Sequence, residues 1–438
     1  MSRVAVIGAG ISGIASAFYL KKEGFFVDLY ESASKIGGRI GSEFLQGRWI
    51  DFGGKNIGRH YLRFRAFVRE MGSFPFEYFG FNTSQLIGGK LVRLTKEDRR
   101  VPNLVTFMKL VGIPGIARLY PWVKAVMNER EQGMLNTPFF NDVASRFDRQ
   151  PLASWFPESC VAHLLRPVTV RMNGAEPDEC YPGNFGSNLA LVLDSYEQLK
   201  GGMHQLLDAF TDRCTGQISI KTGHCVERIS SLSPEGEVEV SFRHEGRRSS
   251  LRYDQIVTAL PAPQLSLLLE PSLPAIARLL KRIRYYPVSV AVVGYRDDVF
   301  TKGHRAMVFD EHSALSNAGA YGLNDLNLVR YTFSGRTARA EIMAESNPEE
   351  VILQAEQKIL PYFSIAENQR TAMMYRYLSP GLCAYSPFHH RLLAELQEAL
   401  GRFPGLSVTG DFRRGASIEA CFAAAAETVQ QLVRKTRF

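Results

Sequence analysis

The sequence predicts an α/β protein built on a parallel β-sheet, and three observations support this prediction. A short apolar run over residues 4–7 leads directly into a glycine-rich turn and then into a helical pattern. Two Gly-Gly pairs follow within the next fifty residues. Near the other end of the chain, a short predicted strand over residues 406–409 precedes another glycine turn and a long apolar helical pattern. Short continuous apolar runs are typical of strands that are buried on both faces of a parallel sheet.

The first apolar run and its turn have the spacing of a Rossmann dinucleotide fingerprint. The turn reads Gly-x-Gly-x-x-Gly between a strand and a helix, and the next expected strand ends at Glu31. Gly8 would permit the tight turn, Gly10 would let the backbone approach a pyrophosphate, and Gly13 would let helix and strand pack closely. Glu31 would accept hydrogen bonds from ribose hydroxyls. The cofactor contacts expected in this segment are Gly8, Gly10, Ile11, Ser12, Gly13, Glu31 and Ser32.

Two further glycine-rich segments indicate which dinucleotide is bound. They read Ile-Gly-Gly-Arg up to Arg39 and Asp-Phe-Gly-Gly-Lys up to Lys55. With the N-terminal turn, they resemble the flavin amine oxidase superfamily, which includes amine oxidases, protoporphyrinogen oxidase, phytoene desaturases and, more distantly, UDP-galactopyranose mutase. The resemblance implies bound FAD, with the first Gly-Gly pair and Arg39 at its phosphates or flavin edge and the second pair beside the isoalloxazine ring. The contacts that it adds are Gly37, Gly38, Arg39, Gly53, Gly54, Lys55 and Asn56.

The C-terminal segment carries the third part of the resemblance. A Gly-Asp turn follows the expected strand, and the sequence Gly-Ala-Ser-Ile-Glu then opens the long apolar helix. The resemblance implies that Asp411 binds the ribityl or phosphate region of FAD, and that the helix beginning near Ser417 directs its positive end at the flavin N1–C2=O edge. Ala420 stands where the family often has glycine. The implied contacts are Gly410, Asp411, Ser417 and Ile418, and two middle strands that resemble family elements add Val226 and Ala259.

Two side chains are candidates for a direct role in catalysis. Lys55 directly follows the second Gly-Gly pair, so its cation could stabilise reduced flavin or orient a substrate carboxylate, or it could face solvent. Tyr385 lies in a segment that resembles the family stretch where an aromatic ring faces the flavin, and a core tyrosine is the alternative. Weaker candidates for a general base, more simply explained as surface or supporting residues, are His60, His389 and His390.

The expected reaction follows from one departure from the family pattern. A β-branched strand is predicted over residues 285–295, and it lacks the lysine that many amine oxidases carry on the equivalent strand. Here the chain is more similar to protoporphyrinogen oxidase and the desaturases. The resemblance implies an FAD-dependent oxidoreductase that dehydrogenates a C–N or C–C bond in a small to medium, apolar biosynthetic intermediate, with O2 or another electron acceptor. One alternative is an amine or amino-acid oxidase that releases H2O2, and another is a non-redox isomerase or mutase that requires reduced FAD.

The order of the motifs predicts a Rossmann-like FAD-binding domain interleaved with an α+β substrate-binding domain. The FAD-binding domain would comprise residues 1–80, 195–262 and 376–438, and the substrate-binding domain residues 81–194 and 263–375. In the first insertion, an apolar stretch over residues 101–128 is interrupted by Pro114-Gly115, which predicts two helices. We expect this stretch to cover an apolar pocket, and a membrane-surface element is the alternative.

Composition sets the remaining expectations. The 438 residues are 45% hydrophobic and 22% charged, as in ordinary globular proteins. The net charge of +8 has no accompanying nucleic-acid-binding signature, so we expect no nucleic-acid partner. A solvated surface explains the charge most simply, while an anionic substrate, an acidic carrier protein or an anionic membrane surface are the alternatives.

Cysteine spacing and the N-terminus bear on cofactor attachment and location. The six cysteines show neither metal-binding nor disulfide spacing, so we expect free thiols and no metal site. Only Cys383 lies near a possible flavin attachment position, and non-covalent FAD is therefore expected. No apolar run is long enough to span a membrane, and no signal peptide is apparent before the first strand. These features predict a cytoplasmic protein, with peripheral membrane contact left open.

Overall fold

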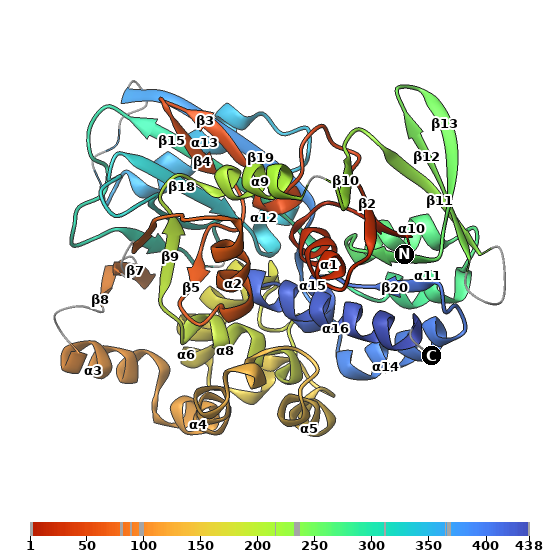
Figure 1. The fold of residues 1–438 in the computed structure, drawn as a ribbon. Helices are drawn as coiled ribbons and strands as arrows, with labels where there is room; N and C mark the ends of the chain where they lie inside the picture. Colours follow the sequence, from red (N-terminus) through yellow and green to blue (C-terminus); the bar gives the residue numbers. More distant parts are fainter. Residues whose placement is uncertain are drawn as a thin grey trace.

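The structure is a computed structural model, and it describes nearly the whole chain. Figure 1 shows a parallel sheet and an antiparallel ribbon at the right, a larger sheet at the upper left, and a group of helices along the lower side. The residues described are 3–78, 82–87, 90–95, 100–214, 216–231, 237–310, 312–363, 365 and 369–436.

The parallel sheet unites three distant parts of the chain. The strand formed by the first apolar run pairs in parallel with a neighbour on each side. Residues 4–7 of the strand are buried, as is typical of a strand covered on both faces. The predicted sheet is therefore confirmed, with strand limits that differ from the expected ones by one residue. In order across the sheet, the described strands are β10 (Ile218–Lys221), β2 (Phe26–Tyr30), β1 (Arg3–Ile7), β14 (Gln255–Thr258) and β20 (Leu406–Val408).

Two helices from opposite ends of the chain pack against each other beside this sheet. They are α1 (Ile11–Lys22) and α16 (Ile418–Thr436), and both contribute to one apolar core with α2 (Leu62–Met71) and α9 (Met203–Arg213). The first turn of α1 and the first turn of α16 are thereby fixed in one region of the molecule. The remaining elements on this side are β11 (Cys225–Ser231), β12 (Val238–His244), β13 (Arg247–Tyr253), α10 (Ala262–Leu269), α11 (Pro274–Lys281), α14 (His389–Gly401) and α15 (Asp411–Arg414).

The larger sheet contains the long β-branched strand predicted from the sequence. This strand is β15 (Tyr285–Tyr295), and it lies inside the sheet between β19 (Arg370–Cys383) and β18 (Leu328–Phe333). The described strands continue beyond β18 with β17 (Leu315–Ala320), β16 (Ala306–Val308), β7 (Asn82–Ile87) and β8 (Lys90–Thr95). A second core lies against this sheet beneath α12 (Arg336–Glu341) and α13 (Pro348–Ile359).

The lower helices include the predicted pair over residues 101–128, but the break between them lies at a different residue. Helix α3 (Arg100–Val111) ends before Gly112, whose φ is +76°, and α4 (Ile113–Asn128) begins directly after it. The expected break at Pro114-Gly115 is wrong because proline fits the first helical turn, where its missing N–H is not needed. The other helices here are α5 (Pro138–Phe147), α6 (Glu158–Cys160), α7 (Arg166–Asn173) and α8 (Gly186–Val192).

Two small sheets connect these parts. They consist of β3 (Ser42–Leu45) with β4 (Arg48–Asp51), and of β5 (Ile57–Gly58), β9 (Tyr196–Leu199) and β6 (Phe76–Tyr78). Among the described helices, none combines the length and the apolar character needed to cross a membrane. All six cysteines are unpaired, and only Cys225 is exposed.

Candidate active site

The glycine turn between β1 and α1 has the geometry that its spacing predicts. Gly8 adopts φ +95°, which favours glycine. A Cβ atom on Gly13 would lie 1.8 Å from the Gly8 carbonyl oxygen, so only glycine lets the helix approach the turn this closely. A Cβ on Gly10, in contrast, would meet no atom of the chain within 4 Å. Open space thus lies over Gly10 at the N-terminus of α1, as a pyrophosphate would require.

Glu31 at the end of β2 supports this turn directly. One of its carboxylate oxygens accepts a hydrogen bond from the Ala9 backbone N–H at 3.0 Å, and the other accepts one from the Ala33 N–H at 2.9 Å. Ser32 Oγ also donates to this second oxygen, at 3.3 Å. The carboxylate is therefore fixed beside the turn, with lone pairs left for ribose hydroxyls. The ribose contact itself stays a prediction.

The first Gly-Gly pair lies against the same turn. The Gly37 N–H donates to the Ala9 carbonyl at 2.8 Å, and Gly37 and Gly10 form a parallel bridge. A Cβ on Gly38 would lie 3.2 Å from the Gly10 Cα atom. Both members of the pair have positive φ, at +119° and +55°. The structure therefore brings the first two sequence motifs together around one open space.

Arg39 joins these motifs to the C-terminal one. Its Nη1 donates to Asp411 Oδ2 and to the Gly381 carbonyl, each at 2.8 Å. The Tyr285 hydroxyl donates to the other Asp411 carboxylate oxygen. Burial alone would lower the pKa of Arg39, but Asp411 raises it above its usual value, so the guanidinium stays charged. The Arg39 side chain remains 35% exposed.

The second Gly-Gly pair is held by a residue that the sequence analysis did not select. Arg330 on β18 donates to the carbonyl oxygens of Asp51, Phe52 and Gly53, at 3.1, 3.2 and 3.1 Å. A Cβ on Gly53 would lie 1.7 Å from the Arg39 carbonyl oxygen, so this segment also needs glycine. A single arginine in an otherwise apolar strand was the available signal for Arg330, but the sequence gives no indication of what it contacts.

Lys55, the first catalytic candidate, points into a buried polar cluster. Its Nζ donates to Gln198 Oε1 at 2.7 Å and to the Tyr321 carbonyl at 2.6 Å. Burial, with a further contribution from the charge of Arg330, lowers the pKa of Lys55 to about 7. A surface position for Lys55 is therefore wrong, whereas the neighbouring Asn56 is exposed. A pKa in this range would let the charge of Lys55 change near neutral pH.

Replacing Lys55 by methionine is expected to change how stability depends on pH. The folded pKa lies below the unfolded value of about 10.4, so the unfolded chain binds more protons between these two values. The free energy of unfolding therefore rises with pH across this range. The contribution of Lys55 to it is complete above the range and is lost as the pH falls to about 7. From about pH 7 to about pH 9, the melting temperature of the wild type should rise relative to that of Lys55→Met. Thermal denaturation series of both proteins would measure this.

The control for this series is Lys200→Met, which removes an exposed lysine. Its melting temperature should follow that of the wild type in parallel over the whole range. A constant difference between the wild type and Lys55→Met would contradict the lowered pKa.

Tyr385, the second catalytic candidate, lies in a different group of residues. It is 1% exposed and adopts φ +54°, and its hydroxyl donates to the Asp411 carbonyl at 3.4 Å. The ring lines a pocket that extends from the surface near His60 and Arg63 to the start of α16. Further lining residues of this pocket are Tyr61, Met134, Met172, Asn173, Asn188, Leu191, Ala416, Ser417 and Ala420.

The histidine candidates differ in environment. His60 lies at the pocket mouth, is exposed, and has its Nδ1 2.8 Å from Asp194 Oδ1. His389 is buried behind Tyr385 with its Nε2 2.7 Å from the Phe412 carbonyl, and burial lowers its pKa to about 4. His389 is therefore neutral at physiological pH and supports the Tyr385 ring. Of these two histidines, His60 is the one among the residues that line the pocket.

The remaining predicted FAD contacts fall on the same side of the molecule. Ala259 follows β14, and its N–H donates to the Ile7 carbonyl at 2.8 Å beside the glycine turn. Val226 lies on β11 and packs against the adjacent core. Ser417 precedes α16, where its Oγ accepts a hydrogen bond from the Ala420 N–H at 3.0 Å, and Ile418 is the first helical residue. The arrangement of glycine turns, free helix N-terminus and Arg39 fits a bound dinucleotide.

Comparison with known proteins agrees with this geometry. Over its whole length, the chain is similar to coproporphyrinogen III oxidase of Mycobacterium bovis, with 24% identity over 467 residues, 98% of this chain and 96% of the relative. Cyclohexylamine oxidase of Brevibacterium oxydans has the same fold, with a TM-score of 0.75, 18% identity and full coverage of both chains. Putrescine oxidase bound to putrescine is similar in fold, with a TM-score of 0.75, 14% identity and 99% coverage of each chain.

A family model describes almost the entire chain. The model for flavin-containing amine oxidoreductases matches residues 11–433, from the first turn of α1 to the last turns of α16. The match includes both Gly-Gly segments and the Arg39–Asp411 pair, and it begins directly after Gly10. The chain therefore belongs to the flavin-containing amine oxidoreductase family, and it is an oxidoreductase with FAD as its cofactor.

Proposed function

We propose that this enzyme dehydrogenates a C–N or C–C bond in a small to medium, largely apolar biosynthetic intermediate. The observation that carries the proposal is the pocket that ends at Tyr385 and at the start of α16. The exposed surface inside the pocket is mostly apolar, but polar and charged residues also line it, among them Asn173, Asn188, Asp194, Ser417 and Glu419. Apolar surface combined with fixed polar groups is the usual form of a small-molecule site.

The residues of the chain would hold the substrate and exclude water. FAD, when bound, supplies the two-electron acceptor, and O2 or another oxidant would restore it. Tyr385 would present its ring to the substrate, with the hydroxyl kept in place by the Asp411 carbonyl. Asn173 is fixed by donating to the Cys383 carbonyl at 3.0 Å and accepting from Asn188 at 2.6 Å. These contacts favour a rigid pocket, which supports positioning as the main contribution of the protein.

The sequence of β15 favours dehydrogenation over primary-amine oxidation. Its buried stretch carries no lysine, and its two hydroxyl groups have partners: Ser289 accepts a hydrogen bond from Tyr375 at 3.1 Å, and Tyr295 donates one to Glu356 Oε1 at 2.7 Å. The full-length relative named for oxidation of coproporphyrinogen III supports a substrate of the partly reduced heterocycle type. An amine or amino-acid oxidase is the second candidate, supported by the likeness in fold to cyclohexylamine oxidase. An isomerase or mutase that needs reduced FAD is the third.

Anaerobic reduction of the bound flavin tests the proposal. The visible flavin absorbance would be followed while porphyrinogens, pyrrolines, polyenes, amines and amino acids are added in turn. We expect the flavin to be bleached by a polyene or by a heterocycle that can lose two hydrogens to form a new double bond. Its colour should return when air is admitted. Bleaching by simple amines with release of H2O2 would favour the second candidate. Turnover only after reduction by dithionite, with no bleaching by any compound, would favour the isomerase.

We also propose that FAD is held non-covalently. Cys383 is the nearest candidate for attachment, but its thiol is fully buried, and burial raises its pKa well above the usual value. A protonated thiol is a poor nucleophile. Acid precipitation should therefore release the yellow colour into the supernatant, and colour that stays in the pellet would contradict non-covalent binding.

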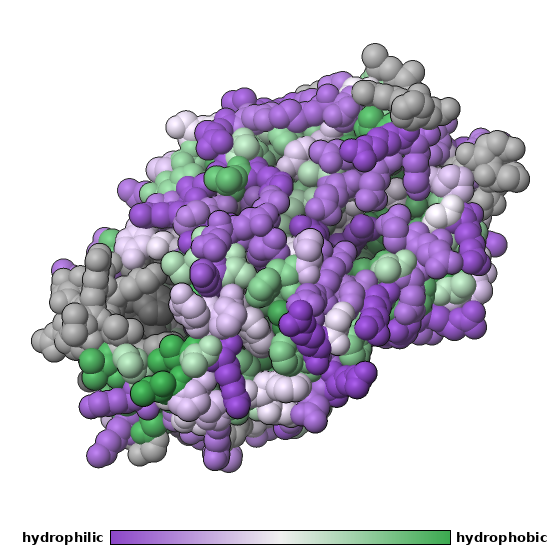
Figure 2. Space-filling view, turned by 90° about the horizontal axis from the view of Figure 1, so that it is seen from below, coloured by the Kyte–Doolittle hydropathy of each residue, from purple (hydrophilic) through white to green (hydrophobic). Residues whose placement is uncertain are grey.

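We infer a cytoplasmic protein that contacts an anionic membrane surface through α4. Ile113, Tyr120 and Met127 are exposed at a spacing of seven residues, which places them on one stripe of the helix. The exposed basic residues Arg118 and Lys124 lie on the same helix. Figure 2 shows apolar side chains gathered at the left of this lower face, where α3 and α4 lie in Figure 1. An apolar stripe with basic neighbours favours an anionic lipid surface.

Sedimentation with vesicles of phosphatidylglycerol and phosphatidylcholine tests this contact. The wild type should sediment with the anionic vesicles, and the double variant Ile113→Glu/Tyr120→Glu should stay in solution. Leu267→Glu, which changes an equally exposed apolar residue on α10, is the matched control and should behave like the wild type. Equal sedimentation of all three proteins, or of none, would contradict the proposed surface.

A further inference from the structure

His60 and Asp194 form a histidine–carboxylate pair in the wall of the pocket, since both residues line it. His60 Nδ1 lies 2.8 Å from Asp194 Oδ1, and the Asp194 side chain is only 4% exposed. The same oxygen accepts the Ser195 N–H at 2.7 Å, and the other carboxylate oxygen accepts the His60 backbone N–H at 3.4 Å. A buried carboxylate thus holds the imidazole ring from one side.

This pair determines which nitrogen of His60 can take up a proton. Because a carboxylate oxygen accepts, Nδ1 of the neutral ring carries the hydrogen and donates it to Asp194. The lone pair is then on Nε2, for which the described residues provide no hydrogen-bond partner. A histidine oriented by a carboxylate, with its second nitrogen accessible, has the usual form of a general base.

The His60 ring contributes little to the packing of the molecule. Its side chain is 53% exposed, so the fold buries only part of its apolar surface. Burying the Asp194 carboxylate is costly, and a half-exposed partner offsets this cost only in part. Two backbone N–H groups also bind Asp194 and would remain if the ring were removed. A role in the pocket therefore explains the ring better than a role in stability.

Contacts between α2 and α16 bring the pair close to the expected flavin edge. Glu419, in the first turn of α16, accepts the backbone N–H groups of Arg63 and Phe64 at 3.0 Å each. His60 precedes Arg63 by three residues, and the pocket that it lines extends to Ser417 at the start of α16. A substrate in this pocket would lie between His60 and the predicted position of the flavin.

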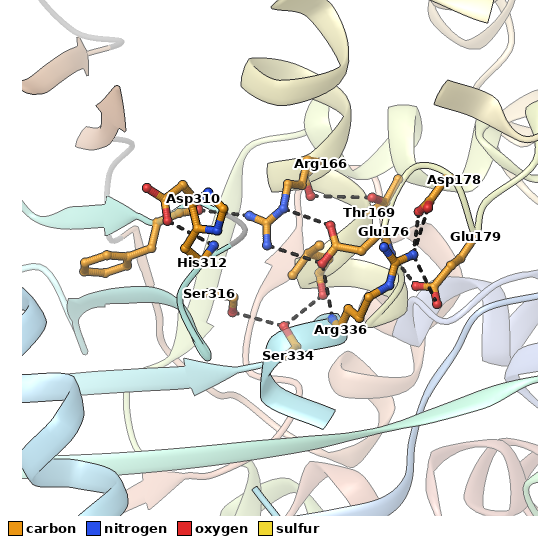
Figure 3. A network of polar contacts seen from close by, with 12 residues as sticks. Arg166, Thr169, Glu176, Asp178, Glu179, Asp310, His312, Ser316, Ser334 and Arg336 are labelled. Carbon is orange, nitrogen blue, oxygen red and sulfur yellow. Dashed lines mark hydrogen bonds and ion pairs between the residues drawn. The ribbon is translucent and has the colours of Figure 1, made fainter. Parts of the chain in front are cut away.

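The helix that supplies Asn173 to the same pocket is anchored by a polar network. Figure 3 shows Arg166 at the start of α7 paired with Glu176, and the Nε to Oε2 distance is 2.8 Å with both side chains buried. Arg166 also donates to the Phe309 carbonyl at 3.1 Å. Because this wall is fixed, a substrate that packs on it would keep one position relative to His60.

We propose that His60, oriented by Asp194, is the base that accepts the proton lost by the substrate. This inference rests on the proposed function and adds a catalytic residue to the same pocket. In the dehydrogenation, one C–H bond breaks, and its hydrogen and electron pair go to FAD, which is reduced. The N–H or C–H bond on the adjacent atom also breaks, and its electron pair forms the new double bond. Its proton bonds to His60 Nε2, and the resulting imidazolium, stabilised by Asp194, later releases the proton to solvent.

Binding of 4-nitrophenol tests this role without turnover. The ligand carries an acidic O–H, and its phenolate form has its own visible absorbance. Titration into the FAD-loaded wild type at mildly acidic pH should raise the phenolate fraction of the ligand, because the proton moves to His60. In His60→Gln the bound ligand should stay neutral, and its Kd should rise about tenfold, as for loss of one charge-assisted hydrogen bond. 4-Nitroanisole, which has no proton to give, should bind both proteins equally.

Two further variants separate the base from its orientation. Asp194→Asn should keep the ring but favour the other tautomer, because the amide N–H can donate to Nδ1 and leave the hydrogen on Nε2. Its phenolate signal should be as small as that of His60→Gln. The matched control is His312→Gln, since Figure 3 shows this exposed histidine beside Asp310 and it is not among the residues that line the pocket. This control should give the wild-type signal.

Three results would overturn the proposal. A phenolate signal that persists in His60→Gln would assign the effect to the arginines that line the pocket. A wild type that binds 4-nitrophenol without forming phenolate, or does not bind it at tens of millimolar, would show that His60 accepts no proton from a ligand there. A lower melting temperature of His60→Gln, with equal losses of affinity for 4-nitrophenol and 4-nitroanisole, would show a structural role instead.

A compound that bleaches the flavin provides the kinetic test. The rate constant of anaerobic flavin reduction should fall about a hundredfold in His60→Gln, with little change in the Kd of that compound. An unchanged rate constant would reject His60 as the base while the proposed reaction stands. If no compound bleaches the flavin, the proposed reaction fails, and the 4-nitrophenol titration still decides whether His60 accepts a proton in the pocket.

Discussion

Replacing Gly10 by alanine is expected to give a folded protein that purifies largely without FAD. The backbone of Gly10 is extended, with φ −72° and ψ −179°, which alanine adopts readily. The added methyl group meets no atom of the chain within 4 Å, so the fold has no reason to change. It would occupy the space over the start of α1 where the pyrophosphate is predicted to bind. The ratio of flavin to protein absorbance and the circular dichroism spectrum would measure the two effects separately.

Two other glycines provide comparison for this result. Gly401→Ala also places a methyl group in open space, but at the end of α14, and should leave FAD content unchanged. Gly13→Ala would place the methyl carbon 1.8 Å from the Gly8 carbonyl oxygen, so it should prevent folding rather than only cofactor binding. Normal FAD content in Gly10→Ala would show that the cofactor does not lie over this turn.

Replacing Asp411 by asparagine is expected to reduce both stability and FAD affinity. The carboxylate pairs with Arg39 at 2.8 Å and accepts the Tyr285 hydroxyl, and the neutral amide would leave the Arg39 charge without its partner. Breaking a buried ion pair typically costs about 3–5 kcal/mol, and partial exposure of Arg39 places the expected loss at or below the lower limit, about 2–3 kcal/mol. Urea denaturation of the FAD-free protein would measure the stability change, and flavin titration the affinity.

A surface pair and a double variant test whether the loss comes from the ion pair. Asp178→Asn removes the partner of Arg336 in a pair that is more than half exposed on both sides, so its cost should stay below about 1 kcal/mol. Adding Arg39→Met to Asp411→Asn should cost little more than Asp411→Asn alone, because the pair is already broken. Additive losses from the two single variants would mean that Arg39 and Asp411 act independently.

Most of the fold could be predicted because its signals are local in the sequence. The first strand, the glycine turn and the next strand occupy one continuous stretch of sequence. The glycines in this stretch meet conformational requirements that arise within the turn itself. Gly8 needs a positive φ, and Gly13 needs close approach of backbone within the same turn. The error over residues 101–128 also has a local cause. The sequence predicts the break between the two helices at Pro114-Gly115, whereas the structure has this break at Gly112. Glycine can adopt the positive φ that the break requires.

The polar cluster around the second Gly-Gly pair could not be predicted in the same way. Lys55 was selected from its position next to two glycines, but its partners Gln198 and Tyr321 come from distant segments. Arg330 lies 277 positions away from the Gly53 carbonyl that it binds. Such contacts depend on how the larger sheet packs against the segments predicted to bind FAD. No short sequence pattern predicts this packing. The sequence shows the chemical properties of these side chains, but it does not show which residues they contact.

The pairing of Arg39 with Asp411 has a consequence for how the protein is made. The predicted FAD site joins Arg39 to Asp411, which is synthesised 372 positions later together with the strand and the helix beside it. A ribosome-bound chain can form the first strands and α1 early, but α1 then lacks the α16 surface against which it packs. We therefore expect FAD to be loaded only after α16 has been synthesised, and the cofactor would act as a late clamp on two segments that lie far apart in the chain.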